Sequence, residues 1–185
     1  MDILKAIGER RSVRKYRSDA VPEEILVEIL NAARNSPSWA NTQAPRFIVI
    51  KDRGIMQALS ETLPRTNPAK NAVATAPCVI CIIAKMKESG YFKGQPATDK
   101  GDWMMFDAGI AMEHIVLAAW NFGLGTVHVG MFDAKAAQEI LKVPEEFAVV
   151  EMTPVGYFDE IPKATPRRAL KESVSLDIFG RPYFE

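Results

Sequence analysis

The sequence of residues 103–125, WMMFDAGIAMEHIVLAAWNFGLG, predicts a helix that is apolar on nearly every side. Four polar residues interrupt the apolar pattern, namely Asp107, Glu113, His114 and Asn121, and the glycines Gly123 and Gly125 end it. A helix without a polar face must be enclosed by other parts of the protein. We therefore expect this segment at the centre of the fold or in an interface between subunits.

Shorter elements flank this helix along the chain. Sequence patterns predict helices over 2–9, 22–36, 53–63 and 136–143, and strands over 46–51, 77–84, 126–130 and 147–158. Helices and strands do not alternate regularly, which favours an α+β fold. The 185 residues fit one domain, 1–185, whose polar tail over 163–185 holds one further possible strand at 173–179. The polar, aperiodic stretch 85–102 predicts a surface loop, and such loops often form lids.

The two cysteines lie three residues apart in the run PCVICIIA, residues 77–84. Because side chains alternate between the faces of a strand, Cys78 and Cys81 should point to opposite sides of the sheet. We therefore expect two buried core cysteines rather than a redox pair or a metal site.

Charge and hydropathy argue against several classes of protein. The 23 Lys and Arg residues balance 23 Asp and Glu residues, whereas a nucleic-acid binder usually carries a positive excess. Charged residues interrupt the N-terminal segment, so no signal peptide is predicted, and no apolar run is long enough to cross a bilayer. We expect a cytoplasmic protein that binds neither nucleic acid nor membrane.

The residues needed for acid–base or metal catalysis do not cluster in the sequence. His114 lies on the apolar helix and His128 in a predicted strand, and no set of Cys and His has metal-ligand spacing. The glycine-rich motifs of the common dinucleotide and nucleoside-triphosphate cradles are also absent. If the chain is an enzyme, we expect no metal and a cofactor that performs the difficult step.

Positive charge gathers in RRSVRKY, residues 10–16. Within five residues, Arg10, Arg11 and Arg14 supply guanidinium groups and Ser12 supplies a hydroxyl. Fork-shaped guanidinium groups beside a hydroxyl suit a phosphate monoester, and Arg167 and Arg168 could complete such a pocket from the other end of the chain. A solvated basic surface is an equally good interpretation of these residues alone.

Two other segments could contact a flat heteroaromatic ring. The loop SPSWANTQAP, residues 36–45, carries the short polar side chains of Ser38, Asn41 and Gln43. The segment GLGTVHVG, residues 123–130, is framed by glycines, which allow the backbone to approach a ring closely. The alternatives are an ordinary turn for the first segment and a helix end followed by a core strand for the second.

Taken together, these segments resemble the FMN-dependent nitroreductase family. RRSVRKY is similar to the family's R-x-S-x-(R/K)-x-(F/Y) phosphate motif, and SPSWANTQAPRF is similar to its S-P-S-x-x-N-x-Q-P-W-x-F loop. The run from Asp102 to Asp133 resembles the family's interface helix and following strand. The motifs occur in the family's order, from the first residues to the arginines near 168.

The resemblance implies a fold and an assembly. The fold would have a central, mostly antiparallel sheet flanked by helices. Two copies would form an intertwined homodimer in which the helix over 103–125 is the buried interface, and the 163–185 tail would extend onto the partner subunit.

The resemblance also implies a set of FMN contacts. Arg10, Ser12 and Arg14 would hold the phosphate, with Arg11 as a helper and Arg168, or Arg167, closing the pocket. Pro37, Ser38 and Asn41 would reach the flavin of the partner subunit. His128, Val129 and Gly130 would pass along one face of the ring, with a backbone N–H near Gly130 or Met131 directed at the reactive N5.

Two departures from the family pattern affect the expected contacts. Gln43-Ala44-Pro45 stands where the family shows Q-P-W, so the aromatic residue is missing. Asn67 and Lys70 keep the spacing of an N-x-x-K pair that contacts the flavin in the family, but they lie slightly early relative to Pro77. Asn71 is the alternative contact.

The implied reaction is a two-step exchange on FMN. NADH or NADPH would transfer hydride to the flavin, and an electron-poor acceptor such as a nitroaromatic or a quinone would then be reduced at the same face. No catalytic side chain is required, because the cofactor carries the chemistry. The alternatives are reductive dehalogenation or a biosynthetic dehydrogenation on the same fold, or a non-catalytic flavin- or phosphate-binding protein.

Overall fold

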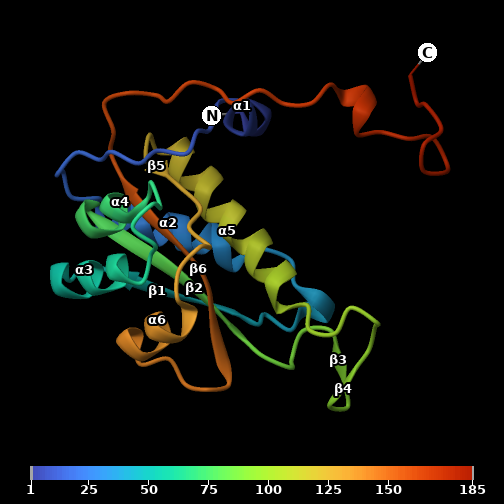
Figure 1. The fold of residues 1–185 in the computed structure, drawn as a ribbon, viewed down its shortest axis with the longest axis horizontal. Helices are drawn as coiled ribbons and strands as arrows, with labels where there is room; N and C mark the ends of the chain where they lie inside the picture. Colours follow the sequence, from blue (N-terminus) through green and yellow to red (C-terminus); the bar gives the residue numbers. More distant parts are fainter. Residues whose placement is uncertain (1, 185) are drawn as a thin grey trace.

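The computed structural model describes residues 2–184, and its centre is a four-stranded sheet (Figure 1). The strands are β1 (Pro45–Ile50), β2 (Cys78–Lys85), β5 (Gly125–Thr126) and β6 (Phe147–Gly156). They lie in the order β1-β2-β6-β5, and each neighbouring pair is antiparallel. The antiparallel sheet and its flanking helices confirm the predicted α+β fold.

Helices cover both faces of this sheet. They are α2 (Glu23–Arg34), α3 (Arg53–Glu61), α4 (Lys70–Thr75), α5 (Met104–Asn121) and α6 (Ala134–Leu141), whereas α1 (Ile3–Glu9) packs on α5. Buried residues of α2 and α5 pack on one face, and those of α3, α4 and α6 pack on the other. Within residues 2–184, no helix has the length and apolar character to cross a membrane.

Strand β2 lies between the two layers of helices and is buried from Cys78 to Ala84. Cys78 packs with α2 and α5, whereas Cys81 packs with α3, α4 and α6. Both cysteines are free and buried, and burial raises the pKa of the Cys78 thiol to about 11 and that of Cys81 to about 12. The prediction of two core cysteines on opposite faces is confirmed.

Helix α5 is only partly enclosed by its own chain. Met112 and Ile115 are fully buried against the sheet and α2. On the other side of the helix, Met105 and Phe106 are 58% and 59% exposed, although both are large and apolar. The enclosure expected from the sequence is therefore not completed within one chain.

The predicted strand over 126–130 is shorter in the structure. Only Gly125 and Thr126 form a continuous ladder with β6, and an isolated bridge between Val129 and Met152 follows in the same register. Thr126 also serves the N-terminal segment, because its carbonyl accepts a hydrogen bond of 2.8 Å from the Val13 N–H. This shared use of Thr126 places residues 10–14 beside the segment that follows β5.

Two segments project from the body of the molecule (Figure 1). The expected surface loop over 85–102 contains a small hairpin of β3 (Tyr91–Phe92) and β4 (Gln95–Pro96). The tail leads away from the sheet and contains a short 3-10 helix, η2 (Leu170–Glu172). The possible strand over 173–179 does not form in the described chain, where Ser175 makes only an isolated bridge to Pro182, because no neighbouring strand lies beside it.

Candidate functional site

The N-terminal arginines lie around one cavity of about 410 Å³, which we call the arginine pocket. Its lining comes from two distant parts of the sequence: Ile7, Gly8, Arg10, Arg11, Ser12 and Arg14 from the first, and Pro162, Lys163, Ala164, Thr165 and Arg167 from the second. The structure thus places Arg167 beside the N-terminal arginines. Arg167 is one of the two C-terminal arginines that the sequence analysis offered for closing the pocket. Arg168 is exposed and does not line the cavity.

Close packing fixes the backbone beneath the arginine pocket. Arg10 caps the end of α1, and Val13, three residues later, is only 1% exposed. Val13 rests directly on Gly125, where an added Cβ would lie 2.6 Å from the Val13 Cβ. The glycine after α5 therefore lets the arginine-bearing segment approach β5.

The guanidinium groups differ in how many hydrogen-bond acceptors the chain itself provides for them. Arg11 Nη1 donates to the carbonyls of Gly8 and Arg10, at 2.8 Å each, and Arg14 Nη1 donates to the Ser12 carbonyl at 3.2 Å. Arg10 Nη1 is buried and has no hydrogen-bond partner within residues 2–184. Leaving such a donor unpaired is costly, and a phosphate oxygen is an acceptor that would satisfy it. The donor set therefore fits the phosphate of FMN.

Residues 127–131, which we call the 127–131 segment, follow β5. Val129 exchanges backbone hydrogen bonds of 3.0 and 3.1 Å with Met152, so its backbone is fixed to β6. The next two residues, Gly130 and Met131, are exposed. A Cβ added at Gly130 would meet nothing within 4 Å, which leaves space beside the backbone for a bound group.

The side chain of His128 lies between two carboxylates. Its Nδ1 is 2.6 Å from Glu151 Oε1 on β6, and its Nε2 is 3.3 Å from Glu113 Oε2 on α5. The hydrogen bonds to Glu113 and Glu151 raise the pKa of His128 to about 9, and the bond to His128 lowers the pKa of Glu113. The sequence analysis did not find these two partners, which lie 15 and 23 residues from His128 in the chain.

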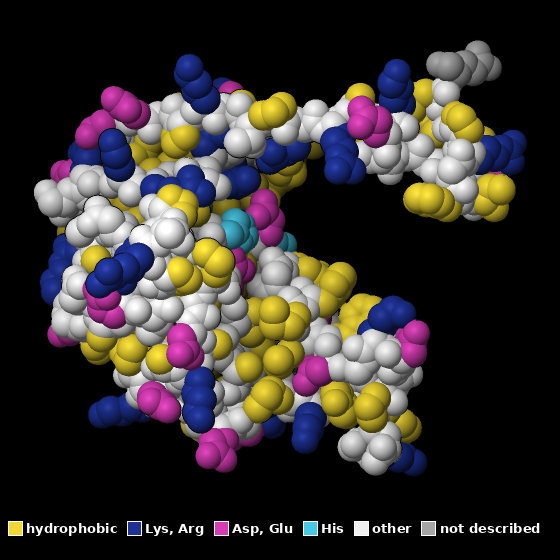
Figure 2. All heavy atoms as spheres, viewed as in Figure 1, with side chains coloured by type: hydrophobic (Ala, Val, Ile, Leu, Met, Phe, Trp, Pro, Cys, Tyr) yellow, Lys and Arg dark blue, Asp and Glu magenta, His cyan; other side chains and the backbone are white. Residues whose placement is uncertain are grey.

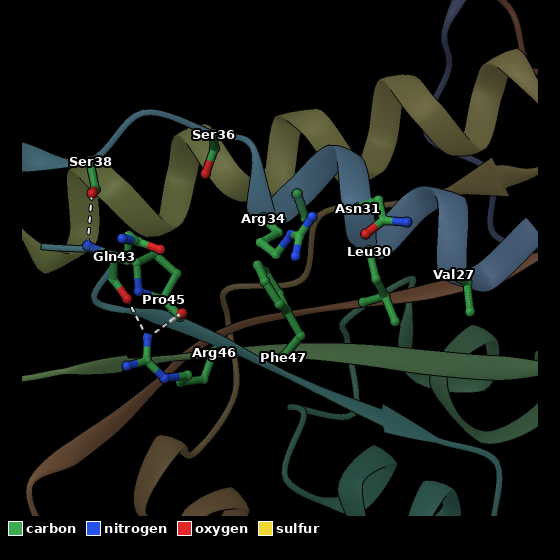
Figure 3. A pocket seen from close by; sticks show the side chains of 11 residues that line it. Val27, Leu30, Asn31, Arg34, Ser36, Ser38, Gln43, Pro45, Arg46 and Phe47 are labelled. Carbon is green, nitrogen blue, oxygen red and sulfur yellow. Dashed lines mark hydrogen bonds between the residues drawn. The ribbon is translucent and has the colours of Figure 1, made fainter. Parts of the chain in front are cut away.

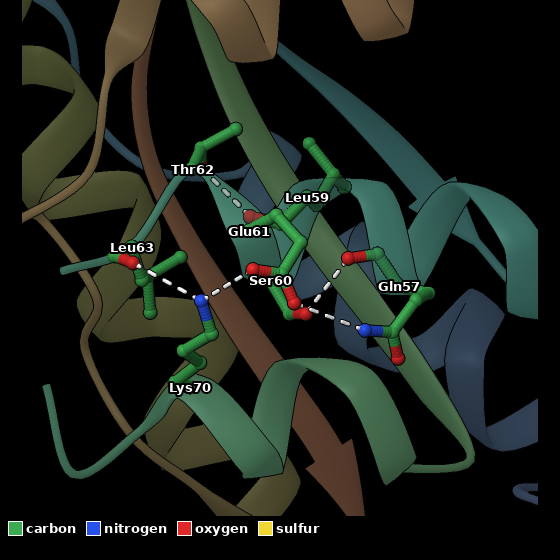
Figure 4. A network of polar contacts seen from close by, with 7 residues as sticks. All are labelled: Gln57, Leu59, Ser60, Glu61, Thr62, Leu63 and Lys70. Carbon is green, nitrogen blue, oxygen red and sulfur yellow. Dashed lines mark hydrogen bonds and ion pairs between the residues drawn. The ribbon is translucent and has the colours of Figure 1, made fainter. Parts of the chain in front are cut away.

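Asn67 and Lys70 precede the sheet strand β2 and lie near different groups. Asn67 Nδ2 donates to the Met131 carbonyl at 3.1 Å, so this side chain supports the 127–131 segment directly. Lys70 Nζ binds Glu61 Oε2 at 2.7 Å and holds α4 against α3 (Figure 4). Asn71 is exposed one residue further along α4. Of the three candidates, Asn67 is the one hydrogen-bonded to the 127–131 segment.

The loop over 36–45 has a strained backbone. Ala40, Asn41 and Gln43 all have positive φ angles, of 47°, 57° and 52°, which residues other than glycine rarely adopt. Ser38 Oγ accepts a hydrogen bond of 2.8 Å from the Gln43 N–H and closes the turn (Figure 3). Strain of this kind persists where the surroundings enforce it, and it is common in binding loops.

This loop borders a second cavity of about 470 Å³ between α2 and β1 (Figure 3). Ser38 and Gln43 line that cavity, whereas Pro37 and Asn41 are exposed. None of its lining residues lines the arginine pocket. Within one chain, therefore, the two groups of predicted FMN contacts do not line a common cavity.

Figure 2 shows a hollow between the body of the molecule, the tail and the hairpin region. Histidine and acidic side chains lie beside one another in this hollow, and apolar side chains gather next to them. The exposed residues of α5 and the β3–β4 hairpin include three large apolar side chains, Phe92, Met105 and Phe106. The molecule thus presents a polar cluster beside an uncovered apolar surface.

Comparisons with known proteins identify the class to which this fold and site belong. The family model described as "Nitroreductase family" matches residues 7–157, and the chain therefore belongs to the nitroreductase family. This confirms the resemblance drawn from the sequence motifs.

Relatives and solved structures agree with this assignment. A protein of Methanothermobacter thermautotrophicus named "Putative NADH dehydrogenase/NAD(P)H nitroreductase" is 32% identical over 166 residues, which cover 88% of this chain and 80% of the relative. A nitroreductase family protein of Clostridium novyi NT is 30% identical, with a TM-score of 0.76 over 99% of this chain and 97% of the other. An "FMN-dependent Nitroreductase" of Clostridium difficile R20291 is 29% identical, with a TM-score of 0.79 over 95% and 99%.

Proposed function

We propose that this protein is a homodimeric, FMN-dependent oxidoreductase that uses NADH or NADPH to reduce nitroaromatic, quinone or similar electron-poor acceptors. The class of enzyme, an FMN-dependent NAD(P)H oxidoreductase, follows from the family match and from the names of the relatives. The acceptor and the homodimer are our own additions to that class.

The unpaired Arg10 Nη1 in the arginine pocket is the observation that carries the proposed FMN site. Arg14, Lys163 and Arg167 add positive charge to the same cavity, and Ser12 adds a hydroxyl. No acidic side chain lines the cavity in the described part of the chain. A phosphate with two negative charges would be stabilised there by charge-assisted hydrogen bonds.

Two features of a single chain support a homodimer. The 36–45 loop, which resembles the family's flavin loop, is built around a cavity separate from the arginine pocket. The exposed side of α5 offers large apolar residues that a second subunit could cover. We infer that Pro37, Ser38 and Asn41 complete the flavin site of the partner, and that the tail over 163–185 extends across the same interface.

In this proposal the chain orients a cofactor, and the cofactor's ring supplies the hydride-transfer chemistry when FMN is bound. Arg10, Ser12 and Arg14 anchor the phosphate. The 127–131 segment would lie beside the ring, and the backbone N–H of Gly130 or Met131 would be available to donate a hydrogen bond to it. Asn67 keeps that segment in place, and no side chain of the protein needs to act as an acid or a base.

The first test is the visible absorption spectrum of the purified protein, before and after NADH or NADPH is added without oxygen. We expect a flavin spectrum that bleaches with at least one nucleotide, and then recovers when a quinone or a nitroaromatic compound is added. A flavin spectrum that neither nucleotide bleaches would contradict the proposed electron donor. A colourless protein that does not take up added FMN would contradict the flavin site itself.

The variant Arg10→Ala tests which residues bind the phosphate. Because charge-assisted hydrogen bonds contribute about 1.5–3 kcal/mol each, we expect FMN affinity to fall by roughly tenfold or more. Arg17→Ala is the matched control, since Arg17 is exposed, pairs with Asp19 at 2.8 Å and does not line the pocket. Fluorescence titration of FMN measures both variants, and equal losses in the two would mean that only general surface charge matters.

A further inference from the structure

The contact between His128 and its two carboxylates joins three parts of the fold. His128 belongs to the 127–131 segment, Glu113 belongs to α5 and Glu151 belongs to β6. The nitrogen–oxygen distances are 2.6 Å to Glu151 and 3.3 Å to Glu113. We call this arrangement the histidine clamp.

The clamp is complete only when the imidazole is protonated. A neutral imidazole has one N–H donor, whereas ionised carboxylates can only accept, so two simultaneous hydrogen bonds require the imidazolium form. The charged groups that act on His128 are Glu113 on α5 and Glu151 on β6, while Arg10 and His114 act on Glu113 and help to lower its pKa. The hydrogen bonds to the two carboxylates outweigh the desolvation of the imidazole by burial, and they raise the pKa of His128 to about 9.

Among the described residues, backbone hydrogen bonds to β6 hold the 127–131 segment only at Val129. The regular ladder with β6 is interrupted at Val127 and His128, between the pairs at Thr126 and Val129. Asn67 supports the far end of the segment through the Met131 carbonyl. Among the contacts of this segment described above, the His128–Glu113 bond is the one that reaches α5.

The same clamp connects the segment with the arginine pocket. The positive charge of Arg10 helps to lower the pKa of Glu113. Arg10 is also the residue whose buried Nη1 lacks a hydrogen-bond partner in the described chain. The clamp therefore lies within electrostatic range of the arginine proposed to bind the phosphate.

We propose that His128 is a positioning residue, which as an imidazolium clamped between Glu113 and Glu151 fixes the 127–131 segment where its backbone faces the flavin. This inference rests on the proposed function, because it assigns the segment to an FMN site. It predicts that FMN binding depends on a proton that neither FMN nor the nucleotide carries.

The dissociation constant of FMN, measured by fluorescence titration between about pH 7 and pH 10, tests the proposal. A group whose pKa is raised by its partners gives its full effect below its ordinary value and loses it as the pH rises through the raised value. If binding requires the imidazolium, wild-type affinity should be constant near pH 7 and about tenfold weaker one pH unit above the histidine pKa.

Three variants separate positioning from a general loss of structure. His128→Phe removes both hydrogen bonds, so we expect weaker FMN binding at pH 7 and loss of the wild-type change between pH 8 and 10. Glu113→Gln removes one carboxylate at constant size, and it should move the change in affinity to lower pH. Glu24→Gln is the control, because Glu24 is exposed on α2 and does not act on His128 or Glu113, and it should keep the wild-type profile.

A second measurement keeps this inference distinct from the proposed function. The chain has two histidines, so NMR titration of the imidazole protons, assigned with the His128→Phe variant, reports directly on the clamp. Titration of His128 near its ordinary value, or wild-type FMN affinity and pH profile in His128→Phe, would overturn the positioning role. If wild-type protein binds no FMN at any pH, the proposed function fails and the flavin-facing role fails with it, while the NMR titration still decides whether the clamp exists.

Discussion

At the scale of single residues, the arginine pocket depends on a glycine that contributes no donor to it. Gly125 begins β5, and its missing side chain leaves room for Val13. An added Cβ would lie between 2.6 and 2.8 Å from three carbons of the Val13 side chain, closer than non-bonded carbons can approach. Since Val13 is buried, the backbone from Arg10 to Arg14 would have to move instead.

We therefore expect Gly125→Ala to destabilise the protein by about 1–3 kcal/mol, the usual cost of overpacking a core. It should also weaken FMN binding, although residue 125 is not proposed to touch the phosphate. Gly8→Ala is the control for stability alone, since Gly8 itself lines the arginine pocket, and a Cβ there meets nothing within 4 Å while helix α1 would gain a better helix former. Chemical denaturation measures both variants, and an unchanged unfolding free energy in Gly125→Ala would show that Val13 can move without cost.

At the scale of elements, one buried carboxylate joins the strained loop to α5. Asp107 is fully buried in the first turn of α5, where it accepts hydrogen bonds from Ser89 Oγ at 2.6 Å and from the Trp39 N–H at 3.0 Å. Trp39 begins the 3-10 turn η1 (Trp39–Asn41) of the 36–45 loop, and Ser89 precedes the β3–β4 hairpin. Asp107 therefore positions two segments that lie far apart in the sequence.

Asp107→Ala should leave the Trp39 N–H and the Ser89 hydroxyl without partners, at a cost of about 1–3 kcal/mol for each buried group. Asp107→Asn should restore part of this loss, because an amide can accept from Trp39 and donate to Ser89. Asp99→Ala serves as the control, since that side chain is 82% exposed and pairs only with Lys100 among its recorded contacts. Thermal unfolding measures stability, and Trp fluorescence checks whether the loop has moved.

The elements also show what the sequence could predict. Periodicity placed α2 correctly, because its apolar residues recur on one face, and the continuous apolar runs of β2 and α5 marked two elements that the fold encloses. The strand expected over 173–179 did not form, because a strand needs a neighbour, and its sequence pattern does not say where that neighbour comes from.

The parts of the candidate site that lie close together in the sequence could be predicted, whereas those that depend on packing could not. Arg10, Ser12 and Arg14 are neighbours in sequence, so a local motif was enough to find them. The contacts of His128 with Glu113 and Glu151 depend on how α5 and β6 pack beside the 127–131 segment. No local pattern contains that information, so the family resemblance implied a ring contact for His128 and did not predict its clamp.

At the scale of the whole molecule, the tail and the exposed side of α5 require a common explanation. The tail leaves the body (Figure 1), and its apolar side chains Leu170, Ile178 and Phe179 are 65%, 69% and 102% exposed. Phe106 on α5 is 59% exposed. Folded proteins rarely leave several large apolar groups uncovered on one face unless that face binds a partner. A second copy of the chain would cover both surfaces at once.

Truncation after Arg168 tests this explanation and keeps every residue that lines the arginine pocket. We expect the chain of 185 residues to sediment as a dimer and the truncated chain to form a weaker dimer, with a higher dissociation constant. Each large apolar side chain buried in the interface contributes about 1.5–3 kcal/mol to the free energy of association. Phe106→Glu should weaken the dimer in the same way through the other surface. Sedimentation at several concentrations measures both. A full-length chain that stays monomeric while it binds FMN would contradict the homodimer, and it would require the 36–45 loop to act without a partner.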